Sequence, residues 1–364
     1  MPARARQYVP VTPQDTLATV FAKRVALSPD AVAYREFDAV SQAWQSRTWA
    51  ETAEMVARVR AALAAEPLSP GDRVAIMLRN GKEWVWFDQA AAAQGLVTVP
   101  IYVDDRPENI AWCLGDAGVK LLFVEGEEHL KRLAEVRGSL PGLARIVTVK
   151  AVKDPDDAAV RALGDWLPAE PFAAPPAAVA GDSLATIVYT SGTTGRPKGV
   201  MLSHQNMLQN VLSGLGGIDV FTDDLFLSFL PLSHMFERTV GYYLTIVSGS
   251  QVAFARSIPQ LAEDFRTVQP TAVVSVPRIY ERMHAAIQAQ LQEAGGAKRR
   301  LFEMARHVGW SLFEWRQGRG PWKPSFLLWP ILRPLVAAKL LARLGGRLRI
   351  AVSGGAALNP QIAH

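Results

Sequence analysis

The stretch Tyr189-Thr-Ser-Gly-Thr-Thr-Gly-Arg-Pro-Lys-Gly199 follows the apolar run Leu184–Tyr189 and is the most specific signal in the sequence. Its eleven residues include three glycines, three threonines, one serine and one lysine. Glycine lets the backbone approach a ligand closely, and hydroxyl and free N–H groups can surround a polyphosphate. The stretch is not a Walker A loop, because Pro197 precedes the lysine and Gly199 follows it. It predicts a phosphate-binding loop; the alternative is a polar hairpin between two strands.

A second polar stretch, Leu230-Pro-Leu-Ser-His-Met-Phe-Glu-Arg238, follows another apolar run. Ligands of open parallel sheets bind at the carboxyl ends of strands, so His234 is placed to contact a substrate, gate a tunnel or move a proton. The alternative is a partly buried histidine that caps a helix. A metal site at His234 and Glu237 has little support, because two ligands do not make a site and no further His or Cys cluster is present.

The third stretch, Ala351-Val-Ser-Gly-Gly-Ala-Ala-Leu358, takes an apolar strand into a Ser-Gly-Gly turn. Such a turn brings bare backbone close to a flat or anionic ligand, although a tight strand–helix turn would look the same. Hydrolase chemistry is disfavoured, because the sequence contains no Gly-x-Ser-x-Gly elbow. Cys113 lies in a helical apolar pattern, and we expect it to be a core residue.

Strand-like and helix-like segments alternate along most of the chain, which predicts an α/β fold: two lobes of mostly parallel sheets flanked by helices. Thr48 and Glu51 form a capping box at the start of one helix. The expected strands cover residues 73–78, 96–101, 120–124, 146–149, 184–189, 225–230, 251–255 and 271–276, and the expected helices cover 49–65, 82–94, 108–116, 129–136, 205–213, 259–268 and 278–292. The Ala/Pro-rich stretch 168–182 is interpreted as a linker between an N-terminal lobe, 1–167, and a second lobe, 183–364.

Length and composition agree with this organisation. The 364 residues suffice for two domains, and 49% hydrophobic against 20% charged residues excludes a mainly disordered chain. A single cysteine excludes a disulfide scaffold and fits a reducing compartment. Residues 1–16 show no secretory signal, and the uncharged run 239–255 is too short and polar to span a bilayer. We expect a cytoplasmic protein, with membrane association as a further option.

The positive charge is concentrated in residues 296–349, which hold twelve Lys and Arg but only two Glu. The same segment contains four of the ten tryptophans and the apolar stretch Phe326-Leu-Leu-Trp-Pro-Ile-Leu332. Indole rings favour the membrane interface, and basic residues are attracted to anionic lipid. The segment therefore predicts peripheral contact with a membrane, against the alternative of an ordinary solvated helical hairpin. No nucleic-acid-binding module is visible, so nucleic acid is not an expected partner.

Together and in this order, the three stretches resemble the signature motifs of the AMP-forming acyl–adenylate ligase superfamily. The form Ser-His-Met-Phe-Glu-Arg238 and the stretch Val276-Pro-Arg-Ile-Tyr-Glu-Arg282 most resemble the long-chain fatty acid–CoA ligase branch. The resemblance implies a ligase that uses ATP, Mg²⁺, a fatty acid and coenzyme A. A fatty carboxylate would attack ATP to give acyl-AMP and pyrophosphate, and the thiol of coenzyme A would then displace AMP.

The resemblance also implies roles for individual residues. Catalytic roles fall to His234 and Lys198, and His234 and Phe236 would border the carboxyl end of the acyl substrate. Either Ser191 or Thr194 is a candidate contact for Mg²⁺. The residues expected to bind the phosphates of ATP are Thr190, Ser191, Gly192, Thr193, Thr194, Gly195 and Lys198. Those expected to line the pocket for adenine and the acyl-adenylate are Ser353, Gly354, Gly355 and Ala356.

The sequence departs from the family pattern in two small ways and one large one. Ala357 and Ser233 replace residues that are common in the motifs, without touching a glycine or His234. The family's later motifs and its C-terminal lid domain with a catalytic lysine are not found, and Asn359-Pro360 begins a helix only four residues before the end. We therefore expect the N-terminal part of a ligase that is inactive alone. The rival interpretations are a ligase for another acyl or aryl acid, or a noncatalytic fragment that binds nucleotide or lipid; the acceptor could also be a carrier protein.

Overall fold

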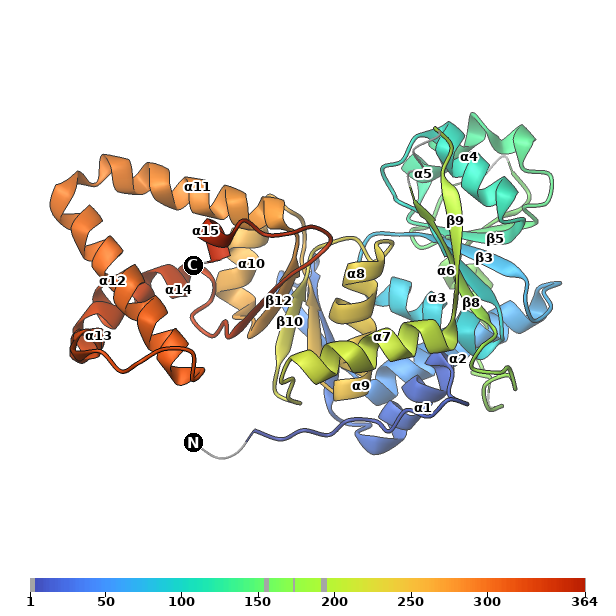
Figure 1. The fold of residues 1–364 in the computed structure, drawn as a ribbon. Helices are drawn as coiled ribbons and strands as arrows, with labels where there is room; N and C mark the ends of the chain where they lie inside the picture. Colours follow the sequence, from blue (N-terminus) through green and yellow to red (C-terminus); the bar gives the residue numbers. More distant parts are fainter. Residues whose placement is uncertain (1–3, 154–156, 173, 191–194, 364) are drawn as a thin grey trace. The chain divides into compact units, whose positions relative to one another are not determined.

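The computed structural model describes residues 4–153, 157–172, 174–190 and 195–363 (Figure 1). The chain forms two compact units. Unit 1 comprises Met1–Asp224 and Ser228–Ala255, and unit 2 comprises Leu225–Leu227 and Arg256–His364. Each unit combines mostly parallel strands with flanking helices, so the predicted α/β class is confirmed.

A seven-stranded sheet with the order β7-β6-β5-β3-β4-β8-β9 lies in unit 1. All neighbouring strands are parallel except β8 and β9, which form an antiparallel hairpin. The strands are β3 (Arg73–Met77), β4 (Val97–Pro100), β5 (Val119–Val124), β6 (Arg145–Thr148), β7 (Val160–Ala162), β8 (Leu184–Thr190) and β9 (Lys198–Ser203). Unit 1 also contains a second group of strands, in which β1 (Val32–Asp38) pairs with antiparallel β2 (Ala43–Thr48) and parallel β11 (Gln251–Phe254).

Helices connect the strands of unit 1. They are α1 (Leu17–Leu27), α2 (Trp49–Ala65), α3 (Lys82–Ala93), α4 (Pro107–Asp116), α5 (Glu127–Ala134), α6 (Leu163–Trp166), α7 (His204–Gly217), α8 (Met235–Glu237) and α9 (Leu244–Ser248), with a 3₁₀ turn η1 (Arg137–Ser139) and a π-helical segment η2 (Arg238–Tyr243). The capping box that begins α2 is confirmed. The Glu51 amide donates to Thr48 Oγ1 at 3.1 Å, and the Thr48 amide donates to Glu51 Oε2 at 2.7 Å.

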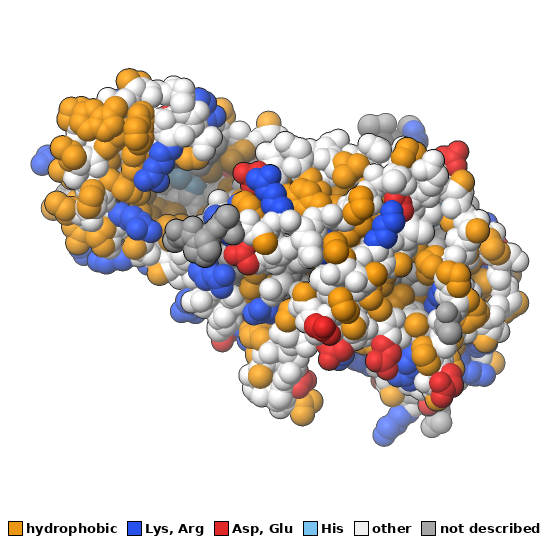
Figure 2. Space-filling view, turned by 90° about the horizontal axis from the view of Figure 1, so that it is seen from below, with side chains coloured by type: hydrophobic (Ala, Val, Ile, Leu, Met, Phe, Trp, Pro, Cys, Tyr) orange, Lys and Arg blue, Asp and Glu red, His pale blue; other side chains and the backbone are white. Residues whose placement is uncertain are grey.

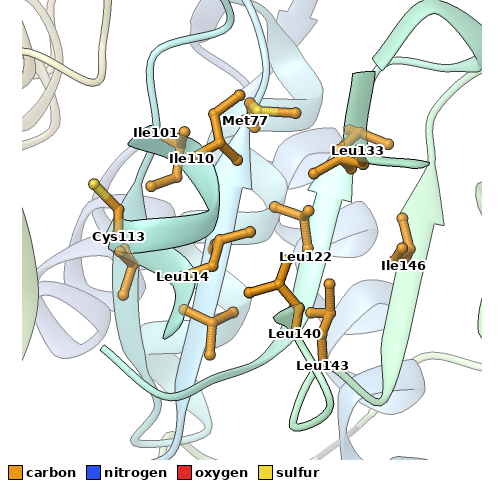
Figure 3. Close-up of a cluster of buried hydrophobic side chains, with 14 of the residues drawn as sticks. Met77, Ile101, Ile110, Cys113, Leu114, Leu122, Leu133, Leu140, Leu143 and Ile146 are labelled. Carbon is orange, nitrogen blue, oxygen red and sulfur yellow. The ribbon is translucent and has the colours of Figure 1, made fainter. Parts of the chain in front are cut away.

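One hydrophobic core of unit 1 packs α4 and α5 against the sheet (Figure 3). Met77, Leu122 and Ile146 reach it from three strands, and Ile110 and Leu133 reach it from the two helices. Continuous apolar strands of this kind are typical of parallel sheets covered on both faces. Cys113 belongs to the same cluster, where burial raises the pKa of its thiol to about 12, so the expected core role is confirmed.

Unit 2 contains three parallel strands in the order β10-β12-β13. They are β10 (Leu225–Ser228), β12 (Ala272–Ser275) and β13 (Ile350–Ser353). The helices of this unit are α10 (Leu261–Val268), α11 (Pro277–Glu293), α12 (Gly295–Arg316), α13 (Trp329–Leu332), α14 (Ala338–Arg343) and α15 (Pro360–Ala363), with a 3₁₀ segment η3 (Pro324–Leu328) and a π-helical segment η4 (Arg333–Ala337). Asn359 caps α15 as expected, because its Oδ1 accepts from the Gln361 amide at 2.9 Å.

One helical stretch of unit 2, Pro324–Arg343, is long and apolar enough to cross a membrane, judged by length and composition alone. Its most apolar window has a mean hydropathy of 1.5, and only 11% of that window is buried. The stretch therefore differs from the core helix of a globular protein, which passes the same test while buried.

The structure divides the chain elsewhere than at the predicted linker. Strands β8 and β9 join the N-terminal sheet, because β8 pairs with β4 at Thr98 and Thr186. The Ala/Pro-rich stretch packs within unit 1: Arg60 donates to the Pro175 carbonyl at 2.5 Å, and the Ala177 amide donates to Ala93 at 2.7 Å. The boundary between the units thus follows residue 255 instead of lying at 168–182.

Candidate functional site

The predicted phosphate loop connects strands β8 and β9, which pair in antiparallel fashion. Thr190 pairs with Lys198 across the two strands, and both side chains are exposed. Gly195 has a φ of +93°, which favours glycine. Ser191, Gly192, Thr193 and Thr194 lie outside the described residues. The strands on either side of the loop pair as a hairpin, and the described part leaves Lys198 open to a ligand.

Helix α4 holds this hairpin in place. The Trp112 indole donates to the Pro197 carbonyl at 3.0 Å, and the Arg196 guanidinium lies 4.5 Å from the centre of the indole ring. Tyr189 donates to Asp116 Oδ2 at 2.6 Å, and burial together with this bond raises the pKa of the tyrosine. A Cβ at Gly199 would come within 2.8 Å of Ile187, so glycine is required there.

A cavity of about 610 Å³ in unit 1 brings the first two motifs together. Its wall includes Thr190 and Pro197 from the hairpin and His234 and Met235 from the second motif. The remaining lining residues are Pro100, Ile101, Tyr102, Asp105, Asn109, Cys113, Val188 and Tyr189. A cavity of this size suits a small-molecule ligand. Phe236 is half-buried and does not belong to this lining.

His234 begins helix α8, and its Nδ1 accepts from the Phe236 amide at 3.2 Å. The imidazole is exposed and lines the cavity. The alternative of a partly buried, helix-capping histidine is therefore confirmed for the capping hydrogen bond. It is wrong for burial, because the side chain is exposed. Because the cap occupies Nδ1, Nε2 is the ring atom left to face a ligand.

Asn80 holds the loop that leads to His234. Its Nδ2 donates to Ser228 Oγ at 2.9 Å and to the Leu230 carbonyl at 2.7 Å, and its Oδ1 accepts from the Leu232 amide at 2.9 Å. The sequence analysis missed this residue, although it follows β3 at the carboxyl end of the strand, where ligand-site residues of parallel sheets gather.

Replacing Asn80 with Ala should lower the free energy of unfolding by roughly 1–3 kcal/mol, because three partners in the loop lose their hydrogen bonds. The Leu232 amide should also exchange its hydrogen faster, which amide exchange measures directly. The matched variant Asn80→Asp keeps the acceptor for Leu232 and should leave that amide protected. Equal exchange in both variants would show that Asn80 does not hold the loop.

Arg238, four residues after His234, is completely buried and forms an ion pair with Asp88 at 2.5 Å. Its other guanidinium N–H groups donate to Thr186 at 2.9 Å and Thr98 at 2.8 Å, which join β8 to β4. Tyr243 donates to the other Asp88 oxygen at 2.7 Å. The second motif is thereby tied to the sheet that carries the phosphate hairpin.

Glu237 is also buried, with 1% of its surface exposed, but neither carboxyl oxygen has a hydrogen-bond partner among the described residues. Burial raises the pKa of Glu237 to about 8, and the nearby Ser228 hydroxyl lowers it only in part. Gly241 makes room for this side chain, because a Cβ at that position would clash with Glu237 Oε1. The carboxyl group is therefore protonated at neutral pH.

In unit 2 the third motif ends strand β13. Ser353 is in register with Ser275 of β12, so both hydroxyls lie on one face of the sheet. Neither buried hydroxyl has a hydrogen-bond partner among the described residues. Gly354 donates its amide to the Ser275 carbonyl at 3.2 Å, and Gly355 has a φ of +78°. Ala356 follows and is exposed, so this strand end presents polar groups and accessible backbone.

Ser275, Tyr102, Asp105 and Asn109 were not singled out from the sequence. Tyr102 and Asp105 follow β4 and Ser275 ends β12, so the strand-end rule would have found these three residues. Asn109 lies on α4, lines the cavity and donates to Asp105 Oδ1 at 2.8 Å, and its helical position gave no such signal.

No group of three or more His, Cys, Asp or Glu side chains that could hold a metal ion occurs in the part of the chain that the structure describes. The two candidate magnesium contacts, Ser191 and Thr194, lie outside it. The magnesium site stays a prediction.

Comparisons with known proteins identify relatives of this chain by sequence and by fold. The chain matches the profile of the AMP-binding enzyme family over residues 21–364. The long-chain-fatty-acid–CoA ligase FadD15 of Mycobacterium tuberculosis is 32% identical over 357 residues, which are 96% of this chain and 58% of that protein. The peroxisomal long chain acyl-CoA synthetase 6 of Arabidopsis thaliana is 32% identical over 306 residues, 80% of this chain and 41% of that protein. The chain thus spans about half the length of these relatives.

Solved structures show the same fold. The A-PCP didomain of carboxylic acid reductase from Segniliparus rugosus in complex with AMP matches with a TM-score of 0.74 and 22% identity, over 97% of this chain and 51% of that one. The inhibitor-bound N-terminal domain of FACL13 from Mycobacterium tuberculosis matches with a TM-score of 0.66 and 20% identity, over 95% of this chain and 71% of that one. Because the family profile covers nearly all of the sequence and the fold agrees, the chain belongs to the AMP-binding enzyme family.

Proposed function

We propose that the chain works in a long-chain fatty acid–CoA ligase and supplies its phosphate loop and the entrance to its acyl site. The observation that carries the proposal is the cavity of unit 1, whose wall joins the phosphate hairpin at Thr190 and Pro197 to His234. Two relatives at 32% identity, whose names state a long-chain fatty acid and a long-chain acyl group, support the choice of acid.

The reaction has two steps. The fatty carboxylate oxygen attacks the α-phosphorus of ATP, the bond to the leaving oxygen breaks, and acyl-AMP and pyrophosphate form. The sulfur of coenzyme A then attacks the acyl carbon and loses its proton, and the bond from that carbon to AMP breaks. The main obstacle in the first step is the approach of one anion to another, so positioning and positive charge supply most of the catalysis.

In this proposal each motif has one task. Lys198 and the loop 190–195 bind the β- and γ-phosphates and stabilise the departing pyrophosphate. His234, with Phe236 behind it, borders the carboxylate of the acid. The Ser353–Ala356 turn lines the adenine pocket, and Ser275 adds a second free hydroxyl beside Ser353. Mg²⁺ would neutralise phosphate charge, and its candidate contacts are Ser191 and Thr194. Cytoplasmic localisation is proposed with the function.

The direct test measures binding of two stable analogues of the intermediate by calorimetry: a hexadecanoyl and an anthraniloyl sulfamoyl adenosine. Tighter binding of the hexadecanoyl compound supports the proposal. Tighter binding of the aryl compound would instead favour a ligase for aryl acids. If the chain binds adenosine nucleotides but neither analogue, it is a nucleotide-binding fragment without an acyl site, and the proposal fails.

Replacing Lys198 with Ala should weaken ATP binding by about 10- to 100-fold, because a hydrogen bond to a charged group contributes roughly 1.5–3 kcal/mol. Titration with ATP and with adenosine checks this, since adenosine affinity should not change. The matched control is Lys131→Ala, another exposed lysine of unit 1. An equal loss for ATP and adenosine would exclude a phosphate role for Lys198.

A further inference from the structure

Exposed apolar side chains are concentrated on one helical hairpin of unit 2, which consists of α12 and residues 322–343. Nine of the fifteen large hydrophobic side chains that are exposed in the described chain lie between residues 304 and 341. Figure 2 shows hydrophobic and basic side chains gathered over the part of the molecule that unit 2 forms. Such concentration on a folded unit marks an interaction surface.

Three of the four most exposed of these side chains share one helical face. Leu327, Ile331 and Leu335 follow each other at intervals of four residues and are 73%, 60% and 46% exposed. Residues at this spacing lie above one another on a helix. Trp322, which precedes the stretch, is 53% exposed. Leu327, Ile331 and Leu335 thus form a row of branched aliphatic side chains, with an exposed indole earlier in the same hairpin.

The opposite face of the same stretch is already occupied. Phe326 and Leu332 form a small core with Ala305, Val308 and Leu312 of α12. Crossing a bilayer would require residues 324–343 to leave this core and expose it. The hairpin can bind a membrane without that cost if it lies along the interface, as amphipathic helices do.

Exposed basic side chains lie on the same hairpin as the row. Arg333 and Lys339 belong to the same helical stretch, are exposed, and form no ion pair or side-chain hydrogen bond with another described residue. Lys298, Arg299 and Arg300 near the start of α12 share these properties. This arrangement attracts an anionic surface and repels a second copy of the same hairpin.

An apolar pocket of about 310 Å³ lies between α12 and the helical stretch that follows it. Phe302, Phe313, Trp329 and Leu340 line it, and Arg306 is the charged residue in its wall. An acyl chain below a phosphate headgroup has the matching chemistry. A nucleic acid would contact the basic side chains, but it would leave the apolar pocket and the aliphatic row without a partner.

We propose that this hairpin, α12 with residues 322–343, docks on the surface of an anionic lipid bilayer and inserts Leu327, Ile331 and Leu335 at the interface. The proposal goes beyond the ligase function and does not depend on it. For a lipid-metabolising enzyme, docking would place the acid substrate and the protein on the same surface.

Co-sedimentation with vesicles tests the proposal without ATP, acid or coenzyme A, so its failure is distinct from failure of the ligase assignment. The chain should bind vesicles of phosphatidylcholine with phosphatidylglycerol, and high salt or pure phosphatidylcholine should weaken this binding. The triple variant Leu327→Gln/Ile331→Gln/Leu335→Gln should lower the partition coefficient by about tenfold or more. The variant Arg333→Gln/Lys339→Gln should lower it several-fold on anionic vesicles only.

The control is Val40→Gln/Met201→Gln, which changes side chains of unit 1 that are 94% and 70% exposed. It should bind as the parent does. Absence of binding to anionic vesicles at low salt overturns the proposal, as does equal binding by the parent and the triple variant. If the parent dimerises in sedimentation velocity and the triple variant does not, while neither binds vesicles, the face binds a second copy. Should the triple variant misfold, the basic-residue variant still decides, because its substitutions remove no buried atoms.

Discussion

Replacing Asp88 with Ala should lower the free energy of unfolding by about 3–5 kcal/mol. Arg238 is completely buried, and arginine does not lose its proton in proteins, so the variant would leave an unpaired charge in the core. Tyr242 and Tyr243 would also lose the carboxylate to which they donate, at 3.1 and 2.7 Å. Urea unfolding followed by circular dichroism measures the effect.

The control for this prediction is Glu127→Ala, which removes an exposed ion pair with Lys131 on α5 and should change stability little. The double variant Asp88→Leu/Arg238→Met should recover much of the loss, because it removes both charges and fills the space with apolar atoms. An Asp88→Ala variant as stable as the control would show that the buried pair does not stabilise unit 1.

The second large effect concerns Glu237 and depends on pH. The pKa of this carboxyl is about 8 in the folded chain, whereas a solvated glutamate, as in the unfolded chain, has an ordinary pKa of 4.5. Between these values the folded protein keeps a proton that the unfolded chain releases, so stability falls as pH rises from about 4.5 to about 8. At 1.36 kcal/mol per pKa unit, the loss is about 5 kcal/mol when complete.

The variant Glu237→Gln has a neutral side chain of the same shape and should not show this loss. Its stability relative to the parent should therefore rise between pH 5 and pH 8 and become constant above that range. Urea unfolding at several pH values measures the difference, and subtraction removes the titrations that both proteins share. The exposed Glu128→Gln variant should follow the parent. A difference that does not change with pH would contradict the protonated state of Glu237.

Local patterns predicted the fold well. The capping box of Thr48 and Glu51 involves residues three apart, and the apolar runs identify the strands because parallel strands are buried on both faces. The motifs also predicted that the loop at 190–199 and His234 serve one site, and Thr190, Pro197 and His234 line one cavity. Their chemical roles stay predictions.

Contacts between distant residues could not be predicted in this way. Asp88 and Arg238 are 150 positions apart, as are Asn80 and Leu230, and nothing in the local sequence indicates either pairing. The linker prediction failed for a related reason. The prolines indicate irregular backbone, but they do not tell whether that backbone joins two units or packs on one of them, as it does through Arg60.

Strand β9 is an edge strand of the seven-stranded sheet, because among the described strands it pairs only with β8. Its outer backbone groups and the exposed Val200 and Met201 could template aggregation by strand addition. A lysine on such a rim discourages that process, and Lys198 is the first residue of β9. We therefore expect that losing the Lys198 ammonium would make the protein more prone to aggregate, in addition to weakening its binding of phosphate.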